Sequence, residues 1–179
     1  MDLQHSKLSG QQASFKILIV GEIGSGKTKL TEKLVNTLIR LGLDKMITVI
    51  DFAPSYRGIG LPLNVHGIRI LKPKKIYAPR LMGKSCDEVW EYARRNAKLT
   101  EPLIKEYIER PTPILIINDL TLYLHAGDPK LLYKAIDLST LFIGNAYYGL
   151  KLKDECSLWQ RERELVEELF RKVDVVWRL

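Results

Sequence analysis

The sequence predicts an α/β domain of three layers, in which a mainly parallel five-stranded sheet is flanked by helices on both faces. Two observations predict this class. Short apolar segments alternate along the chain with segments of helical periodicity, which is typical of strands joined by right-handed helical crossovers. In addition, the first apolar segment leads directly into a glycine-rich loop and then into an amphipathic segment.

The composition indicates a single globular domain of ordinary size. Of the 179 residues, 46% are hydrophobic and 27% are charged, as in globular proteins. The polar residues 1–13 are predicted to form a flexible leader, which leaves 14–179 as one domain. The chain has no apolar run of about 18 residues and no signal-peptide pattern at its start, so we expect no membrane contact.

The two cysteines, Cys86 and Cys156, are far apart in the sequence and lack the spacing of a metal site. We therefore expect reduced thiols, which indicate a cytoplasmic protein. The sequence carries no signal for an oligomeric state.

The first elements form a strand–loop–helix unit. Residues 15–20 predict a short buried strand, and residues 29–41 predict an amphipathic helix that Gly42 ends. A second strand is predicted over 46–50, and Asp51 follows it directly.

Residues 54–84 form a basic segment that accounts for the whole net charge of +7, because it contains seven cations and no Asp or Glu. Four prolines and four glycines predict that it is mostly loop, although residues 67–71 could form a short edge strand. The cations are Arg57, Arg69, Lys72, Lys74, Lys75, Arg80 and Lys84.

A helix is predicted to begin at Ser85, because Ser85 and Glu88 have the spacing of a capping box. A second helical piece is predicted over 101–110, since Pro102 suits a first turn and another proline closes the piece. Residues 54–110 together are a candidate insertion or lid. The remaining predicted elements are a strand at 114–117, a helix at 129–137, a strand at 140–143, a helix at 157–172 and a strand at 173–177.

Residues 21–28 match the pattern G-x-x-x-x-G-K-[ST] at every fixed position. Between a strand and a helix, the backbone N–H groups of such a loop can hold phosphate oxygens. Lys27 would reach the β- and γ-phosphates and the Thr28 hydroxyl would bind Mg²⁺, whereas a glycine-rich turn without a ligand is the alternative. The predicted nucleotide-binding residues of the loop are Gly21, Glu22, Ile23, Gly24, Ser25, Gly26, Lys27 and Thr28.

In this Walker A motif and in its element order, the chain resembles the P-loop NTPase superfamily. The resemblance implies that ATP and Mg²⁺ bind at the loop. The element order is similar to the minimal core of the RecA-like ATPases, which implies that the P-loop strand lies beside the strand that leads to Asn145. Small-molecule kinases with a similar element count place the Walker B strand there instead, and the sequence leaves this neighbour relation open.

The apolar strand before Asn118 and Asp119 has the character of a Walker B strand, and two alignments are open. In the first, which we favour, Asp119 binds Mg²⁺, because a carboxylate satisfies this ion better than a neutral amide. Leu120 then stands where many ATPases have their activating Glu. In the second, Asn118 faces the metal and Asp119 is the catalytic base. An Asp119 that only caps the following turn is a third interpretation.

Asp51 is the candidate base under the first alignment, because it ends a strand at the edge of the sheet where ligands bind. Residues 49–54 are similar to the corresponding stretch of ParA- and MinD-type ATPases, in which an Asp positions the attacking water, although Glu22 stands where they have a signature Lys. An ordinary turn residue is the alternative for Asp51. The RecA-like resemblance implies that Asn145 contacts the γ-phosphate or the water. It could instead contact the base, or be an ordinary turn residue. The candidate catalytic residues are Lys27, Asp51 and Asp119.

Three functions are therefore open. The favoured one is an ATPase whose hydrolysis drives a conformational change or assembly; the absence of an Asn-Lys-x-Asp motif favours ATP over GTP. The second is a small-molecule kinase with 54–110 as acceptor site and lid. In it, Arg57 or Arg80 would stabilise charge near the γ-phosphate and 54–84 would hold an acidic or phosphorylated ligand. The third is a slow-turnover module whose basic segment binds nucleic acid.

Overall fold

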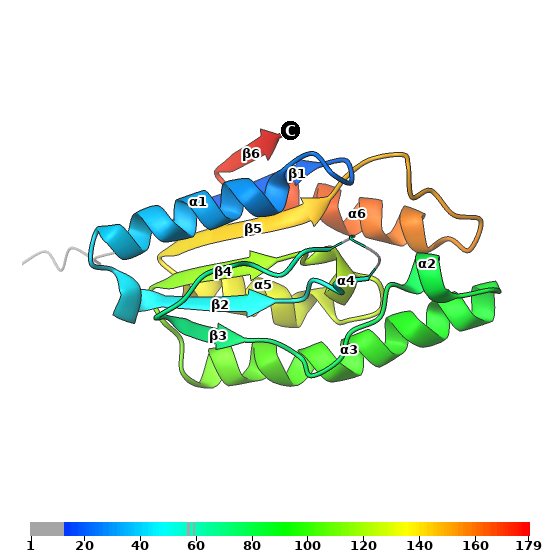
Figure 1. The fold of residues 1–179 in the computed structure, drawn as a ribbon, viewed down its shortest axis with the longest axis horizontal. Helices are drawn as coiled ribbons and strands as arrows, with labels where there is room; N and C mark the ends of the chain where they lie inside the picture. Colours follow the sequence, from blue (N-terminus) through cyan, green and yellow to red (C-terminus); the bar gives the residue numbers. More distant parts are fainter. Residues whose placement is uncertain (1–12, 57, 59) are drawn as a thin grey trace, which may run out of the picture.

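The computed structural model describes residues 13–56, 58 and 60–179, so the predicted leader lies almost wholly outside the described residues. Six parallel strands form one sheet in the order β3-β2-β4-β5-β1-β6 (Figure 1). The predicted parallel sheet between helices is confirmed, but the predicted count of five strands is wrong. The strands are β1 (Phe15–Gly21), β2 (Ile47–Asp51), β3 (Arg69–Leu71), β4 (Ile114–Asn118), β5 (Leu141–Tyr147) and β6 (Val175–Arg178).

The additional strand, β3, pairs with β2 at one edge of the sheet, within the short segment that the sequence marked as a candidate strand. In the centre, β2 and β4 are buried along their whole length. Their near-continuous runs of β-branched and aliphatic residues suit strands that are covered on both faces.

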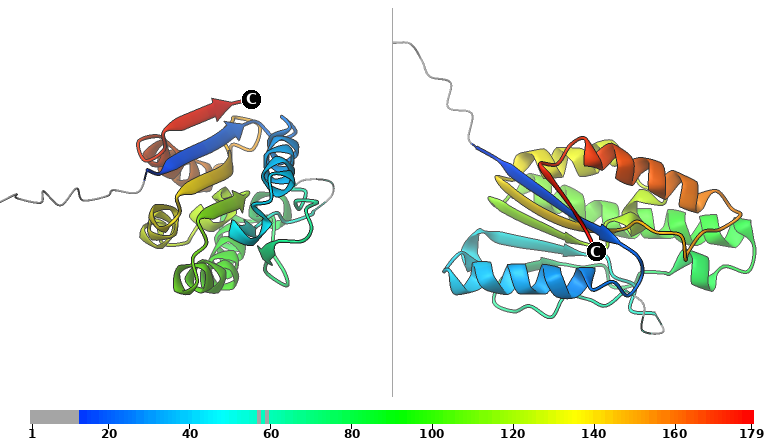
Figure 2. Two further views of the ribbon diagram at one scale, coloured as in Figure 1. Left: turned by 90° about the vertical axis from the view of Figure 1, so that its left-hand side faces the viewer. Right: turned by 90° about the horizontal axis from the view of Figure 1, so that it is seen from above.

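Helices cover both faces of the sheet (Figure 2). Helix α1 (Lys27–Arg40) covers one face together with the chain around Leu63 and Val65. The larger helices on the other face pack over a second apolar cluster. They are α3 (Cys86–Glu109), α5 (Pro129–Leu138) and α6 (Leu158–Phe170), with the short α4 (Thr121–Leu124) beside them, while α2 (Pro79–Met82) precedes α3.

Helix α3 is continuous, so the prediction of two helical pieces is wrong. Pro102 lies inside it, although an interior proline removes one helical hydrogen bond. The helix packs against α4 and α5, and Ile104 and Tyr107 are buried there. In the turn before the proline, the Thr100 hydroxyl donates to the Asn96 carbonyl. Tertiary packing therefore outweighs the local preference for a break.

The two predicted helix caps have different outcomes. Ser85 caps α3 as predicted, since its hydroxyl accepts from the Glu88 N–H at 3.3 Å. Ser157 does not cap α6, because its backbone is left-handed and its side chain makes no cap hydrogen bond. The Asp154 carboxylate replaces it and accepts from the N–H groups of Leu158 and Trp159.

Cys86 and Cys156 form a disulfide, so the prediction of free thiols is wrong. The fold brings the first residue of α3 to the β5–α6 loop across 70 residues of sequence, with the two Cα atoms 5.1 Å apart. The cysteines therefore no longer support the prediction of a cytoplasmic location. In the part of the chain that the structure describes, no helix is both long enough and apolar enough to cross a membrane.

Candidate functional site

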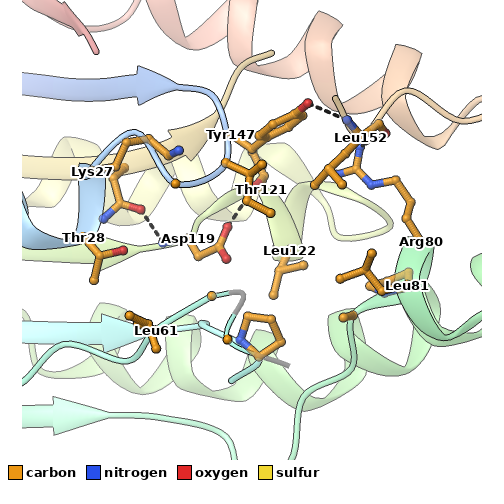
Figure 3. A pocket seen from close by; sticks show the side chains of 18 of the residues that line it. Lys27, Thr28, Leu61, Arg80, Leu81, Asp119, Thr121, Leu122, Tyr147 and Leu152 are labelled. Atoms are coloured by element: carbon orange, nitrogen blue, oxygen red, sulfur yellow. Dashed lines mark hydrogen bonds between the residues drawn. The ribbon is translucent and has the colours of Figure 1, made fainter. Parts of the chain in front are cut away.

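A cavity of about 580 Å³ lies at the carboxyl ends of the central strands, the edge at which ligands bind in open parallel sheets. It has two ends (Figure 3). One end, which we call the phosphate end after the ligand that the loop motif predicts, is lined by Gly24, Gly26, Lys27, Thr28, Asp119 and Asn145. The distal end is lined by Arg80, Leu81, Leu122, His125, Tyr147 and Leu152. Pro54, Gly58, Gly60 and Leu61 from the basic segment form a further wall.

The loop 21–28 connects β1 to α1 and brings the start of this helix to the cavity. Gly24 and Gly26 have φ angles of 76° and 92°, which disfavour residues with a Cβ. Helix α1 begins at Lys27 without a side-chain cap. The N–H groups of its first turn therefore lack a side-chain acceptor, and the positive end of the helix dipole faces the cavity.

Lys27 folds back onto its own loop. Its ammonium donates to the carbonyls of Gly21 and Glu22 at 2.9 and 2.6 Å. Burial lowers the pKa of Lys27, and the negative charges of Asp119 and Glu22 oppose that shift. Both acceptors are backbone atoms, so the side chain can turn toward a phosphate without leaving a buried carboxylate unpaired.

Asp119 faces the phosphate end, between Thr28 and Thr121 (Figure 3). Its φ of 57° is left-handed, a conformation that Asp tolerates better than most residues. Its N–H donates to the Asn145 side-chain oxygen at 2.8 Å and its carboxylate accepts from the Thr121 hydroxyl at 3.0 Å. Burial raises the pKa of Asp119, against the hydrogen bond from Thr121 and the charge of Lys27.

Asn118 is turned away from the cavity and into a buried polar network. Its amide nitrogen donates to Asp51 at 2.7 Å and to the Leu61 carbonyl, and its oxygen accepts from Asn145. Asn145 also donates to the Thr31 hydroxyl. This geometry favours the alignment in which Asp119, rather than Asn118, would face a metal.

Asp51 belongs to the same network and is not among the residues that line the cavity. The residue is 5% exposed, and its carboxylate accepts from Asn118 and from the N–H groups of Ala53 and Leu63. Both oxygens are therefore committed to fixing the chain after β2. This arrangement fits a structural role better than that of the base.

The distal end has a buried charged group that comes from three elements. The Glu162 carboxylate of α6 accepts from Arg80 of α2 and lies against Nε2 of His125, which follows α4. The Arg80 and Glu162 side chains are 10% and 2% exposed. A further Arg80 nitrogen donates to the Leu152 carbonyl at 3.0 Å. The charges of this end therefore compensate each other.

Glu22 joins the phosphate end to the β5–α6 loop. Its carboxylate accepts from the N–H groups of Leu150 and Lys151, and the Leu150 bond lowers the pKa of Glu22. A Cβ on Gly149 would meet this carboxylate at 2.3 Å. The residue that departs from the signature Lys of the ParA and MinD group thus holds the loop that carries Leu152.

Sequence reasoning named Lys27, Thr28, Asp119, Asn145 and Arg80, and all five line the cavity. It did not find His125 and Glu162, because a single His or a Glu on a helix carries no motif. Arg57 lies outside the described residues. Of the other predicted loop residues, Ile23, Gly24 and Gly26 also line the cavity, whereas Gly21, Glu22 and Ser25 shape the loop without lining it.

Comparison with protein-family models gives no match for this chain, and comparison with curated proteins gives no significant match.

Proposed function

We propose that the chain binds ATP and Mg²⁺ at the phosphate end of the cavity and hydrolyses the nucleotide. The observation that carries this proposal is the convergence of the loop 21–28, Lys27, Thr28 and Asp119 on one cavity at the carboxyl edge of a parallel sheet. The alternative, a glycine-rich turn without a ligand, does not explain why the Asp119 carboxylate lies across a cavity from the start of α1.

The residues present fit the nucleotide and its metal. The uncapped N-terminus of α1 suits phosphate oxygens, and the Ser25 hydroxyl is buried without a partner among the described residues. No group of three or more His, Cys, Asp or Glu in that part of the chain could hold a metal by itself. Thr28 and Asp119 would hold Mg²⁺ together with the phosphates, as is usual for this ion, which neutralises phosphate charge.

The strand order supports the ATPase over the kinase. Strand β5 lies between β1 and β4, which is the neighbour relation that the RecA-like resemblance implies. Asn145, inside β5 and two residues before its carboxyl end, lies against both Asp119 and Asn118. Coupling of hydrolysis to a conformational change or to assembly remains part of the proposal.

Turnover is expected to be slow. Leu120 is fully buried where a carboxylate base would be useful, and Asp51 is engaged elsewhere. The described cavity-lining groups that can accept a proton as carboxylate or imidazole are Asp119 and His125. A general base normally raises the rate by a factor of about 100 to 10,000. Because this site lacks a well-placed base among the described residues, we expect a low kcat.

Transfer of the γ-phosphoryl group to a second substrate is the other candidate function. It is favoured by one observation, the continuation of the cavity beyond the phosphate end into the distal end. Under this alternative, activity would depend on an added hydroxyl compound.

A phosphate-release assay with ATP and with GTP, paired with calorimetric binding and with and without Mg²⁺, tests the proposal. We expect Mg²⁺-dependent phosphate release and tighter binding of ATP. No binding of either nucleotide would overturn the proposal. A preference for GTP of about tenfold, or 1.4 kcal/mol, would overturn the choice of ATP.

A further inference from the structure

The distal end has the character of a binding site for an uncharged molecule. Four of the six residues that define it, Leu81, Leu122, Tyr147 and Leu152, present mainly apolar surface. Ligand sites typically combine such surface with a few fixed polar groups. If nucleotide phosphates occupy the phosphate end, the distal end remains for another molecule or for another part of the same ligand.

The charges at this end do not favour an anion. Arg80 lines the cavity but is paired with Glu162 through one terminal nitrogen, and its other terminal nitrogen donates to the Leu152 carbonyl. Of the other described cations of the basic segment, Lys72, Lys74 and Lys75 are exposed and do not line the cavity. An anionic ligand would have to compete with Glu162 for Arg80, at the cost of leaving a buried carboxylate without the Arg80 charge.

His125 supplies an unused hydrogen-bonding atom. The residue lines the distal end and is 1% exposed. Its Nε2 lies against the Glu162 carboxylate, which can only accept, and 3.3 Å from an Arg80 nitrogen, which can only donate. The carboxylate is the closer of the two, so we assign the ring proton to Nε2. Nδ1 is buried without a partner among the described residues. In the neutral ring, this atom accepts a hydrogen bond.

The walls of the distal end are held in place. The Cys86–Cys156 disulfide joins the start of α3 to the β5–α6 loop, and the Trp90 indole donates to the Cys156 carbonyl at 2.8 Å. The Tyr147 hydroxyl accepts from the Leu152 N–H at 2.8 Å. A site whose walls are fixed before binding loses less conformational entropy when a ligand enters.

We propose that the distal end binds an uncharged molecule with an apolar body and a hydroxyl group that donates to Nδ1 of His125. The proposal rests on the proposed function only in assigning the phosphate end of the cavity to the nucleotide phosphates. It names the class of second ligand, and it differs from the acidic or phosphorylated ligand that the basic segment predicts from sequence.

Three probes of matched shape test the class of ligand: benzyl alcohol, toluene and benzoate. Their binding to the full chain is measured by ligand-observed NMR, with and without ATP and Mg²⁺. We expect benzyl alcohol to bind roughly fivefold more tightly than toluene, the effect of one hydrogen bond, and benzoate to bind most weakly. Benzoate binding as tightly as the alcohol, or no detectable binding of the alcohol at millimolar concentration, overturns the proposal.

Two variants locate the site. His125→Phe keeps an aromatic ring and the Arg80–Glu162 pair but removes Nδ1, so the advantage of the alcohol over toluene should disappear. Leu81→Trp adds volume at a position that is 36% exposed and should weaken binding of both neutral probes without disturbing the core. Unchanged binding of both probes to Leu81→Trp overturns the location, even if His125→Phe does not fold.

The loop variant Lys27→Ala separates this proposal from the proposed function. It should lose ATP binding and still bind benzyl alcohol as the wild type does. Wild-type protein that binds the alcohol but no nucleotide would overturn the proposed function alone. Protein that binds and hydrolyses ATP but shows no preference for the alcohol would overturn the distal site alone.

Discussion

The two ends of the cavity are built differently. The phosphate end depends mainly on one stretch of chain, the loop 21–28 with the start of α1, and the sheet adds Asp119 and Asn145 opposite it. The distal end depends on side chains from α2, α4, β5 and α6, and a disulfide and several hydrogen bonds hold its walls. The difference implies that changes in distant elements should affect the distal end first, whereas the phosphate end should respond mainly to changes in its own loop.

Loss of the disulfide should have the largest effect on stability. Cys86→Ser with Cys156→Ser releases a loop of 70 residues, so the free energy of unfolding should fall by about 4 kcal/mol, measured by urea unfolding without reductant. ATP affinity should change little, because the bond holds the distal end. Wild-type protein with reductant is the matched control. Two free thiols in the denatured, unreduced wild type would contradict the bond.

Lys27→Ala should have the largest effect at the phosphate end. Hydrogen bonds to charged groups are worth about 1.5–3 kcal/mol each, so ATP affinity should fall roughly 100-fold. The melting temperature should hold, since Lys27 bonds only to loop carbonyls. Lys33→Ala, at an exposed position on the same helix, is the control. Calorimetry that finds equal ATP affinity in the Lys27 variant and the wild type would refute the site.

Asp51→Asn tests whether the buried hydrogen-bond network of Asp51 and Asn118 has a structural role. An amide cannot accept all the hydrogen bonds that the carboxylate receives from Asn118, Ala53 and Leu63. The free energy of unfolding should fall by about 1–3 kcal/mol. The kcat of the folded variant should change little. A large loss of kcat at unchanged stability would instead restore Asp51 as the base.

Asp119→Asn should separate stability from metal binding. Asn suits the left-handed backbone, and its oxygen can keep the bond from Thr121. Because burial raises the pKa of Asp119, the folded protein binds this proton more tightly than the unfolded chain. The wild type should therefore lose stability relative to the variant as the pH rises above about 4. At neutral pH the variant should be the more stable protein but should bind Mg²⁺ and ATP more weakly.

Unfolding measured from acidic to neutral pH, with calorimetry at neutral pH, tests this. A variant that is less stable than the wild type at neutral pH would show that the charged carboxylate is compensated in the folded protein. Unchanged Mg²⁺-dependent ATP affinity would remove Asp119 from the metal site.

Neutralising Lys72, Lys74 and Lys75 should have the smallest effect, because these side chains are exposed and lie outside both ends of the cavity. ATP and benzyl alcohol should bind as in the wild type. Binding of a single-stranded oligonucleotide should weaken, and the slope of log affinity against log salt should flatten by about 0.7 for each lost contact. An unchanged slope would leave the basic segment without a role in polyanion binding.

The fold was predictable where local patterns and tertiary structure agree. The buried strands β2 and β4 were predicted within one residue of their bounds, because their apolar runs have no competing interpretation. The break at Pro102 was predicted wrongly, since packing of α3 overrides the local signal. The cap at Ser157 failed because Asp154 offers a charged acceptor to the same N–H groups.

The sequence by itself determined the loop side of the phosphate end, because the proposed backbone anion site needs glycines, a lysine and a helix start in one continuous run. Only the tertiary structure decided that Asp119 faces the cavity while Asp51 and Asn118 bond to each other. Only the tertiary structure joined Cys86 to Cys156 and Arg80 and His125 to Glu162. The physical reason is that such contacts depend on how helices pack over the sheet, and residues 37 to 82 positions apart leave no local pattern in the chain.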